Sequence, residues 1–258
     1  MTESVMTALI GFSIVFGGAM AGMAANILWP GPLSCGETKD VVRGATGMLS
    51  LLAALVLGLL LSSAKNSFDT KTREVQEFAA NLALLGSVLH DYGPEAKPAW
   101  VLMREATLAK VHLMWPNDSR NMPVMFDPRL VGKFEAVQGM VLALTPQSNA
   151  QHWLQSRALQ IVAEIDHERW LIGAQSGSSI QPPFLYILLC WITALFFSFG
   201  LFARVNTITF LALLICAASI SAAVLLILDL DSPFAGLITI SPQPILHALA
   251  MAAEVVPP

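Results

Sequence analysis

Four long apolar stretches without a charged residue constrain this chain more than any other feature of its sequence. An α-helix needs about 20 apolar residues to cross the hydrocarbon core of a bilayer. The chain is only 12% charged, whereas a soluble globular protein carries about 25% charged residues. The sequence therefore predicts an all-α membrane protein with four transmembrane helices, which run from about Thr7 to Leu28, from Gly44 to Ala64, from about Pro183 to Ala203 and from Val205 to Leu228.

A cleaved signal peptide is the alternative interpretation of the first stretch. Signal peptides begin with a positively charged region, whereas the residues before Thr7 include Glu3 and no Lys or Arg. We therefore expect this stretch to remain in the protein as a membrane helix.

The segment of residues 65–177 is predicted to be the water-soluble part of the chain. It holds eleven of the 14 Lys and Arg residues and twelve of the 18 Asp and Glu residues. Its apolar residues recur at spacings of three and four, as on one face of an α-helix. The clearest run is Val75, Phe78, Ala79, Leu82, Leu85, Val88 and Leu89. Breaks at Gly93-Pro94, Trp115-Pro116 and Thr145-Pro146 divide the segment into four predicted helices, the last capped by Ser148 or Asn149.

These patterns predict four segments along the chain. Residues 1–64 form transmembrane helices one and two, and residues 65–177 form a helical soluble module. Residues 178–230 form transmembrane helices three and four, joined by a tight turn at Arg204 and Asn206. Residues 231–258 form a C-terminal interfacial segment, in which Ile245 to Ala253 are expected to be a short amphipathic helix. The Lys and Arg residues that flank the spans favour a cytoplasmic module only slightly.

Small residues recur along one side of the first span and along one side of the second. Such residues let the backbones of membrane helices approach closely. We therefore expect helix packing, between these two spans or against a neighbouring subunit, at Gly11, Gly18, Gly22 and Gly47. The alternative is that the second span faces a pore, which hydrophobic side chains can gate by dewetting. The pore-lining candidates are then Thr46, Ser50, Ala54, Leu57, Gly58 and Ser62.

An acidic motif follows the fourth span, where Asp229 and Asp231 end a long uncharged run. The motif is typical of a helix end, followed by Ser232 as N-cap and Pro233 as the first residue of a new short helix. Its remaining members are Phe234 and Gly236. The alternative is an acidic ring around an axis or a calcium site. Calcium takes about six to eight oxygen ligands, so a neighbouring chain would have to complete the site. No other metal and no cofactor is expected.

Other function classes are disfavoured. The net charge of −4 has the wrong sign for a nucleic-acid-binding protein. No span carries a charged residue at its centre, which argues against a proton relay or an ion-coupled transporter. Nucleotide-binding and catalytic motifs are missing, and the cluster from Asp166 to Arg169 is typical of exposed charges on a solvated helix face. The spacing of Cys35, Cys190 and Cys216 also fits neither a metal-binding motif nor a redox motif. We therefore do not expect an enzyme.

Four motifs occur in order over nearly the whole chain. They are AALVLGLLLSSAKNSFD (Ala53–Asp69), LHDYGPEA (Leu89–Ala96), ALQIVAEIDHERW (Ala158–Trp170) and LDLDSPFAGLITIS (Leu228–Ser241). Together they resemble the bacterial bestrophin-like integral-membrane family. The family's name marks its similarity to the bestrophins, which are pentameric anion channels with four spans per subunit. In bestrophins a helical cytosolic domain lies between spans two and three, and the second span lines the pore.

The resemblance implies an oligomeric ion channel in the bacterial inner membrane. This channel would be a pentamer that conducts small anions, such as chloride, through a pore lined by the second span. The module and both termini would be cytoplasmic, and the partners would be the lipid bilayer and other copies of the chain, with no nucleic acid. The alternative is a non-conducting scaffold or accessory subunit that binds other membrane proteins through its small-residue helix faces.

The sequence departs from these relatives in its second span and at three single positions. Gly44 to Ala64 contains no Phe, Tyr or Trp, although bestrophins place an aromatic neck on the second span. Gly86 and Trp100 stand where the bestrophin-like pattern leads us to expect an acid and an arginine, and Ser232 stands where an arginine often precedes Pro-Phe. An ion pair that stabilises relatives is therefore expected to be lost from this chain.

Overall fold

The computed structural model describes residues 2–28, 36–115, 128–174, 182–203, 205–234 and 236–255. Every regular element in these ranges is a helix, and four of the helices are long and apolar enough to cross a membrane. The all-α fold with four transmembrane helices is therefore confirmed. The elements in chain order are α1 (Thr2–Leu28), α2 (Gly36–Tyr92), the 3-10 helix η2 (Pro94–Ala96), α3 (Lys97–Met114), α4 (Pro128–Leu142), α5 (Asn149–Ala174), α6 (Pro182–Phe202), α7 (Thr207–Asp231) and α8 (Gln243–Val255).

The chain forms two compact units, which are described separately. The membrane unit consists of Met1–Ser67 and Ser178–Ser232. The helical module consists of Phe68–Gly177 and Pro233–Pro258. The C-terminal residues thus group with the segment that lies between the second and third spans.

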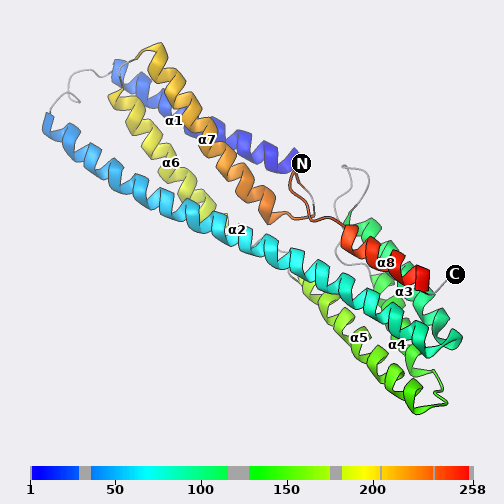
Figure 1. Ribbon diagram of the computed structural model, residues 1–258. Helices are drawn as coiled ribbons and strands as arrows, with labels where there is room; N and C mark the ends of the chain where they lie inside the picture. Colours follow the sequence, from blue (N-terminus) through cyan, green and yellow to red (C-terminus); the bar gives the residue numbers. More distant parts are fainter. Residues whose placement is uncertain are drawn as a thin grey trace. The chain divides into compact units, whose positions relative to one another are not determined.

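α2 is one continuous helix of 57 residues, which contains both the second span and the first helix of the module (Figure 1). No proline interrupts it, and good helix formers such as Ala64, Lys65 and Lys71 lie where the apolar composition ends. The helix ends before Gly93, whose φ is 126°. L-residues with a side chain rarely adopt such a positive φ, so a glycine is suited to this break.

In the membrane unit, α1 packs against α6 and α7 (Figure 1). Glycines on both partners allow α1 and α6 to approach closely. A side-chain carbon on Gly22 would overlap the carbonyl oxygen of Phe197, and one on Gly200 would overlap the carbonyl oxygen of Ala19. The two backbones are therefore in direct contact, as small residues permit in membrane helices.

Hydrogen bonds from polar side chains join the helices of the membrane unit. Asn26 Nδ2 donates to the carbonyl oxygen of Ala203 at 3.0 Å, and Ser221 Oγ donates to the carbonyl oxygen of Ala8 at 2.7 Å. The side chain of Asn206 caps α7 by accepting a backbone N–H of its first turn. Each of these polar groups is thereby satisfied where water is scarce.

The core of the helical module is formed by the apolar faces of α2, α3, α4, α5 and α8. The α2 residues that spacing placed on one face all belong to this core: Val75, Phe78, Ala79, Leu82, Leu85, Val88 and Leu89. The short C-terminal helix is also present as α8, and it contributes Ile245, Ala248, Leu249 and Ala252. Its apolar face is thus packed within the module.

The prediction of a new short helix starting at Ser232-Pro233 is wrong. Pro233 and Phe234 lie in a turn, and the next described helix begins at Gln243. The amide of Ile240 donates to the carbonyl oxygen of Pro233 at 2.8 Å, and Trp115 Nε1 donates to the carbonyl oxygen of Ile240 at 2.7 Å. The segment is held as a loop because these backbone groups bond across it.

Gly86 and Trp100, two of the positions expected to depart from the bestrophin-like pattern, lie against each other in the module core. Trp100 is 2% exposed. A side-chain carbon on Gly86 would lie 3.3 Å from Cη2 of Trp100 and 2.5 Å from Cβ of Ala252. The Trp100 ring therefore packs over Gly86 through apolar contacts. These are the two positions at which we expected this chain to lack an ion pair of its relatives.

Candidate functional site

The second span, in the first part of α2, is the candidate functional surface. Only 11% of its most apolar 18-residue stretch is buried, whereas 28% of the corresponding stretch is buried in the spans of α1 and α6. The buried side chains of this span are Ala53, Leu60 and Ala64. Their spacing of seven and four places them on one narrow stripe, so most of the span's circumference is uncovered within the single chain.

Large apolar side chains occupy one uncovered side of the span, which we call the leucine face. Its members are Val41 (72% exposed), Met48 (74%), Leu51 (73%), Leu55 (60%) and Leu59 (62%). Their spacing of three, four and seven puts them on one side of the helix. Because exposing this much apolar surface to water is unfavourable, lipid or another chain must cover it.

Small residues occupy a second uncovered side, which we call the small-residue face and define by Gly47, Ala54 and Gly58. A side-chain carbon added at Gly47 or at Gly58 would meet no atom within 4 Å. This face has therefore no partner helix in the described part of one chain, and space lies directly beside its backbone.

The predicted pore-lining residues do not share one face of α2. Thr46, Ser50 and Leu57 are half-buried, whereas Ala54, Gly58 and Ser62 are exposed. A spacing of four residues advances about 40° around an α-helix at each step, so the row from Thr46 to Ser62 winds from the buried stripe to the uncovered side. Thr46 Oγ1 donates to the carbonyl oxygen of Val42 at 2.8 Å, which occupies its hydroxyl. The pore-lining role of the six stays a prediction.

The glycines predicted to pack lie in different surroundings. A carbon on Gly18 would lie 2.8 Å from Cγ2 of Thr193, so this glycine, like Gly22, lies against α6. A carbon on Gly11 would meet Leu189 Cδ1 at 3.9 Å, an ordinary contact. Gly47, in contrast, lies on the open small-residue face, and its packing role stays a prediction.

The acidic motif lies at the end of α7. Asp229 is 2% exposed, and the helix ends at Asp231. The amide of Ser232 donates to the carbonyl oxygen of Asp229 at 3.1 Å. In the part of the chain that the structure describes, no group of three or more His, Cys, Asp or Glu side chains is placed to hold a metal ion. Within this part of the chain, no third carboxylate therefore joins Asp229 and Asp231 at the predicted calcium site.

Charged side chains are buried in the helical module around Arg169 of α5. Arg169 is 9% exposed, its guanidinium carbon lies 4.8 Å from the centre of the Phe134 ring, and its Nη2 lies 3.1 Å from Asp166 Oδ1. The prediction of a solvated cluster is wrong for Arg169, because Phe134 of α4 covers it. Burial, and then the charge of Arg169, lower the pKa of Lys110 on α3 to about 8, while Asp166 opposes this shift.

Glu168, the neighbour of Arg169, is half-buried beside α2. Asn81 Nδ2 donates to Glu168 Oε1 at 2.7 Å. Burial raises the pKa of Glu168 to about 7, the Asn81 bond opposes this, and the charges of Glu77 and Glu164 add to it. Sequence spacing did not indicate this group, because Asn81 and Glu168 are 87 residues apart.

The contribution of Glu168 to the stability of the protein is expected to fall as the pH rises from about 4.5 to about 7, because folded Glu168 holds its proton more tightly than the unfolded chain does. Glu168→Gln should flatten this part of the stability curve. The measurement is the midpoint of thermal unfolding of the detergent-purified protein across this range. Glu135→Gln, at an exposed position of α4, is the control and should keep the wild-type slope. An unchanged slope in Glu168→Gln would contradict the assignment.

The chain is similar to a known protein family and to solved structures. A family model described as a Bestrophin-like domain matches residues 10–245. Among solved structures, three crystal structures of a bacterial bestrophin homologue from Klebsiella pneumoniae, each with a different mutation, are similar to this chain. Their TM-scores are 0.68, 0.66 and 0.64, and each is 11% identical to this chain in sequence. In the same order, the matches cover 98%, 97% and 96% of this chain and 98%, 99% and 98% of the chain in the crystal structure. No curated protein matches. At this identity the structural similarity shows the fold.

Proposed function

This chain belongs to the bestrophin-like family, and from that premise we propose that it forms a homo-oligomeric ion channel whose pore is lined by the second span. We assign it to the bacterial inner membrane as a pentamer with a cytoplasmic module, by its resemblance to the bestrophins. The proposed activity is passive conduction, and no catalytic role is assigned to any residue.

The exposure of α2 is the observation that carries this proposal. The leucine face and the small-residue face are about 100° apart around the helix. In a ring of subunits the leucine face can pack against neighbouring copies, while the small-residue face borders the central axis. A channel thus accounts for both uncovered faces of one span, and it leaves no large apolar surface in water.

The charges around the second span favour anions. Residues 44–64 carry no acidic side chain, and the basic residues Arg43 and Lys65 flank them on either side. Rings of basic side chains select anions in pores, as acidic rings select cations. Five copies of this span would place positive charge at both ends of an uncharged passage.

The first functional test is ion flux through liposomes that contain the purified protein. We expect halide flux to exceed alkali-cation flux. Ala54→Trp, on the small-residue face, should reduce halide flux at least about tenfold, because an indole ring fills a narrow pore. Ile215→Trp places the same ring at an exposed position of α7, outside the second span, and is the control, which should retain most of the flux.

Equal flux in the two tryptophan variants would argue against a pore along the small-residue face. Electron micrographs of the purified particle give an independent check, since a five-fold ring is expected. Monomeric particles without flux would instead support a non-conducting scaffold, in which the uncovered small-residue face binds another membrane protein.

A further inference from the structure

A cavity of about 220 Å³ lies among α1, α6 and α7 in the membrane unit. Its closed side is formed by Val15, Leu188 and Ile192, which are 1–3% exposed. Its outer side includes Ile10 (52% exposed) and Tyr186 (68%). The cavity therefore opens towards the outside of the three helices, where lipid chains surround a membrane span.

The walls of the cavity are almost entirely hydrocarbon. The hydroxyl of Ser221, which lies at the wall, donates to the carbonyl oxygen of Ala8 at 2.7 Å and is occupied by that bond. Water needs two to four polar partners to be held in a cavity, and apolar cavities of about 150 Å³ in soluble proteins stay dry and bind small hydrocarbons. The occupant that suits this cavity is therefore apolar.

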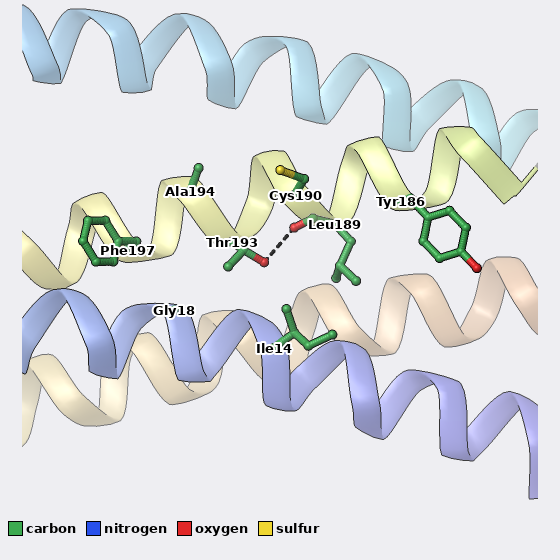
Figure 2. A pocket seen from close by; sticks show the side chains of 8 residues that line it. All are labelled: Ile14, Gly18, Tyr186, Leu189, Cys190, Thr193, Ala194 and Phe197. Carbon is green, nitrogen blue, oxygen red and sulfur yellow. Dashed lines mark hydrogen bonds between the residues drawn. The ribbon is translucent and has the colours of Figure 1, made fainter.

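A groove of about 540 Å³ on the surface of α1 and α6 adjoins the cavity, because Ile14, Tyr186 and Leu189 line both hollows. Figure 2 shows Ile14 and Leu189 pointing toward each other between the two helices, with Tyr186 farther along α6. Thr193 Oγ1, in the groove, donates to the carbonyl oxygen of Leu189 at 2.7 Å. A compact guest would fill the cavity alone, whereas a long flexible chain can occupy both hollows.

We propose that the cavity binds the end of an unbranched hydrocarbon chain, whose preceding methylenes lie in the groove. The chain is the acyl chain of a membrane phospholipid or of a free fatty acid, which share this chemistry. The site is independent of the proposed channel, since α1, α6 and α7 form it without any residue of α2.

The test is photolabelling of the protein in lipid nanodiscs with two probes, which are used separately. One is a phospholipid that carries a diazirine on one acyl chain, and the other is a diazirine-labelled palmitic acid. Mass spectrometry of peptides should place the label on residues 7–15 and 185–192. Excess unlabelled palmitic acid or phospholipid should reduce it there at least about tenfold. Labelling around Ile215, which is 64% exposed on α7, is the reference for ordinary lipid contact and should not saturate.

Gly11→Leu is the matched variant, because Gly11 lines the cavity and its added side chain would start in ordinary contact with Leu189. It should reduce labelling of both peptides at least about tenfold. Gly17→Leu, on the same helix, adds the same side chain where no atom lies within 4 Å and should label like the wild type. Labelling by one probe alone would identify phospholipid or fatty acid as the source. Wild-type labelling in Gly11→Leu, or labelling that does not saturate in the wild type, would overturn the proposal.

Discussion

Replacing Gly22 by leucine is expected to separate α1 from α6 and to prevent the membrane unit from folding. The new side chain would overlap the carbonyl oxygen of Phe197 and start 2.9 Å from the amide nitrogen of Leu201. Overpacking a core where side chains can shift costs about 1–3 kcal/mol. Here the obstacle is backbone on a rigid helix, so we expect a loss of stability of at least about 3 kcal/mol.

The measurement is the yield of monodisperse protein after detergent extraction, together with its midpoint of thermal unfolding. Gly17→Leu is the control because it places the same side chain on the same helix with no atom within 4 Å. Gly200→Leu should reproduce the defect from the α6 side, since its side chain would overlap the carbonyl oxygen of Ala19. A Gly22→Leu protein that unfolds within a few degrees of the wild type would contradict the close α1–α6 contact.

The second large effect is expected at Gly86, in the core of the helical module. Gly86→Ala would place a methyl group 2.5 Å from Cβ of Ala252 on α8 and 3.3 Å from the Trp100 ring. Because Trp100 is fully enclosed and α8 is a helix of only 13 residues, α8 should be displaced. We expect a loss of about 2 kcal/mol in the free energy of unfolding and faster proteolysis in the segment before α8.

A reciprocal exchange tests this contact directly. The double variant Gly86→Ala with Ala252→Gly moves the methyl group from α8 to α2, and it should recover most of the lost stability and protease resistance. Gly139→Ala is the control in the same module, because a carbon there would meet no atom within 4 Å. Failure of the double variant to recover, with a destabilised single variant, would show that the Trp100 ring and not α8 is the obstacle.

Close packing at Gly86 would also account for the two departures from the bestrophin-like pattern that the sequence led us to expect at positions 86 and 100. An acid at position 86 would have no room beside Ala252, and Trp100 fills the space above the glycine. Local sequence rules did not reveal this contact, because Gly86, Trp100 and Ala252 lie on three different helices. Only the packing of those helices makes the three positions neighbours.

The candidate site was foreseen in part. The sequence singled out the second span by its small and hydroxylated residues, and this span is the least buried of the four. A spacing of four selected Thr46, Ser50 and Ser62 as one row, whereas the helical repeat turns that row around α2. The leucine face was not recognised, because a run of leucines in a membrane span has no distinctive pattern until its neighbours are known.

The sequence alone determined the four spans, the helical nature of the module and several helix ends. Transfer of a side chain into hydrocarbon depends mainly on that side chain, so its free energies add along a contiguous run. Helix ends also depend on few residues. Asn206 accepts a backbone N–H of the first turn of α7, and Gly93 supplies the positive φ after α2.

Only the tertiary structure decided which surfaces meet. It paired the glycines of α1 with α6, buried Arg169 beneath Phe134 and packed α8 into the module core. Such contacts join residues far apart in the chain, as the bond between Asn26 and Ala203 does across 177 positions. They depend on the shapes of two surfaces at once, and this complementarity is a property of the folded helices that no local window of sequence contains.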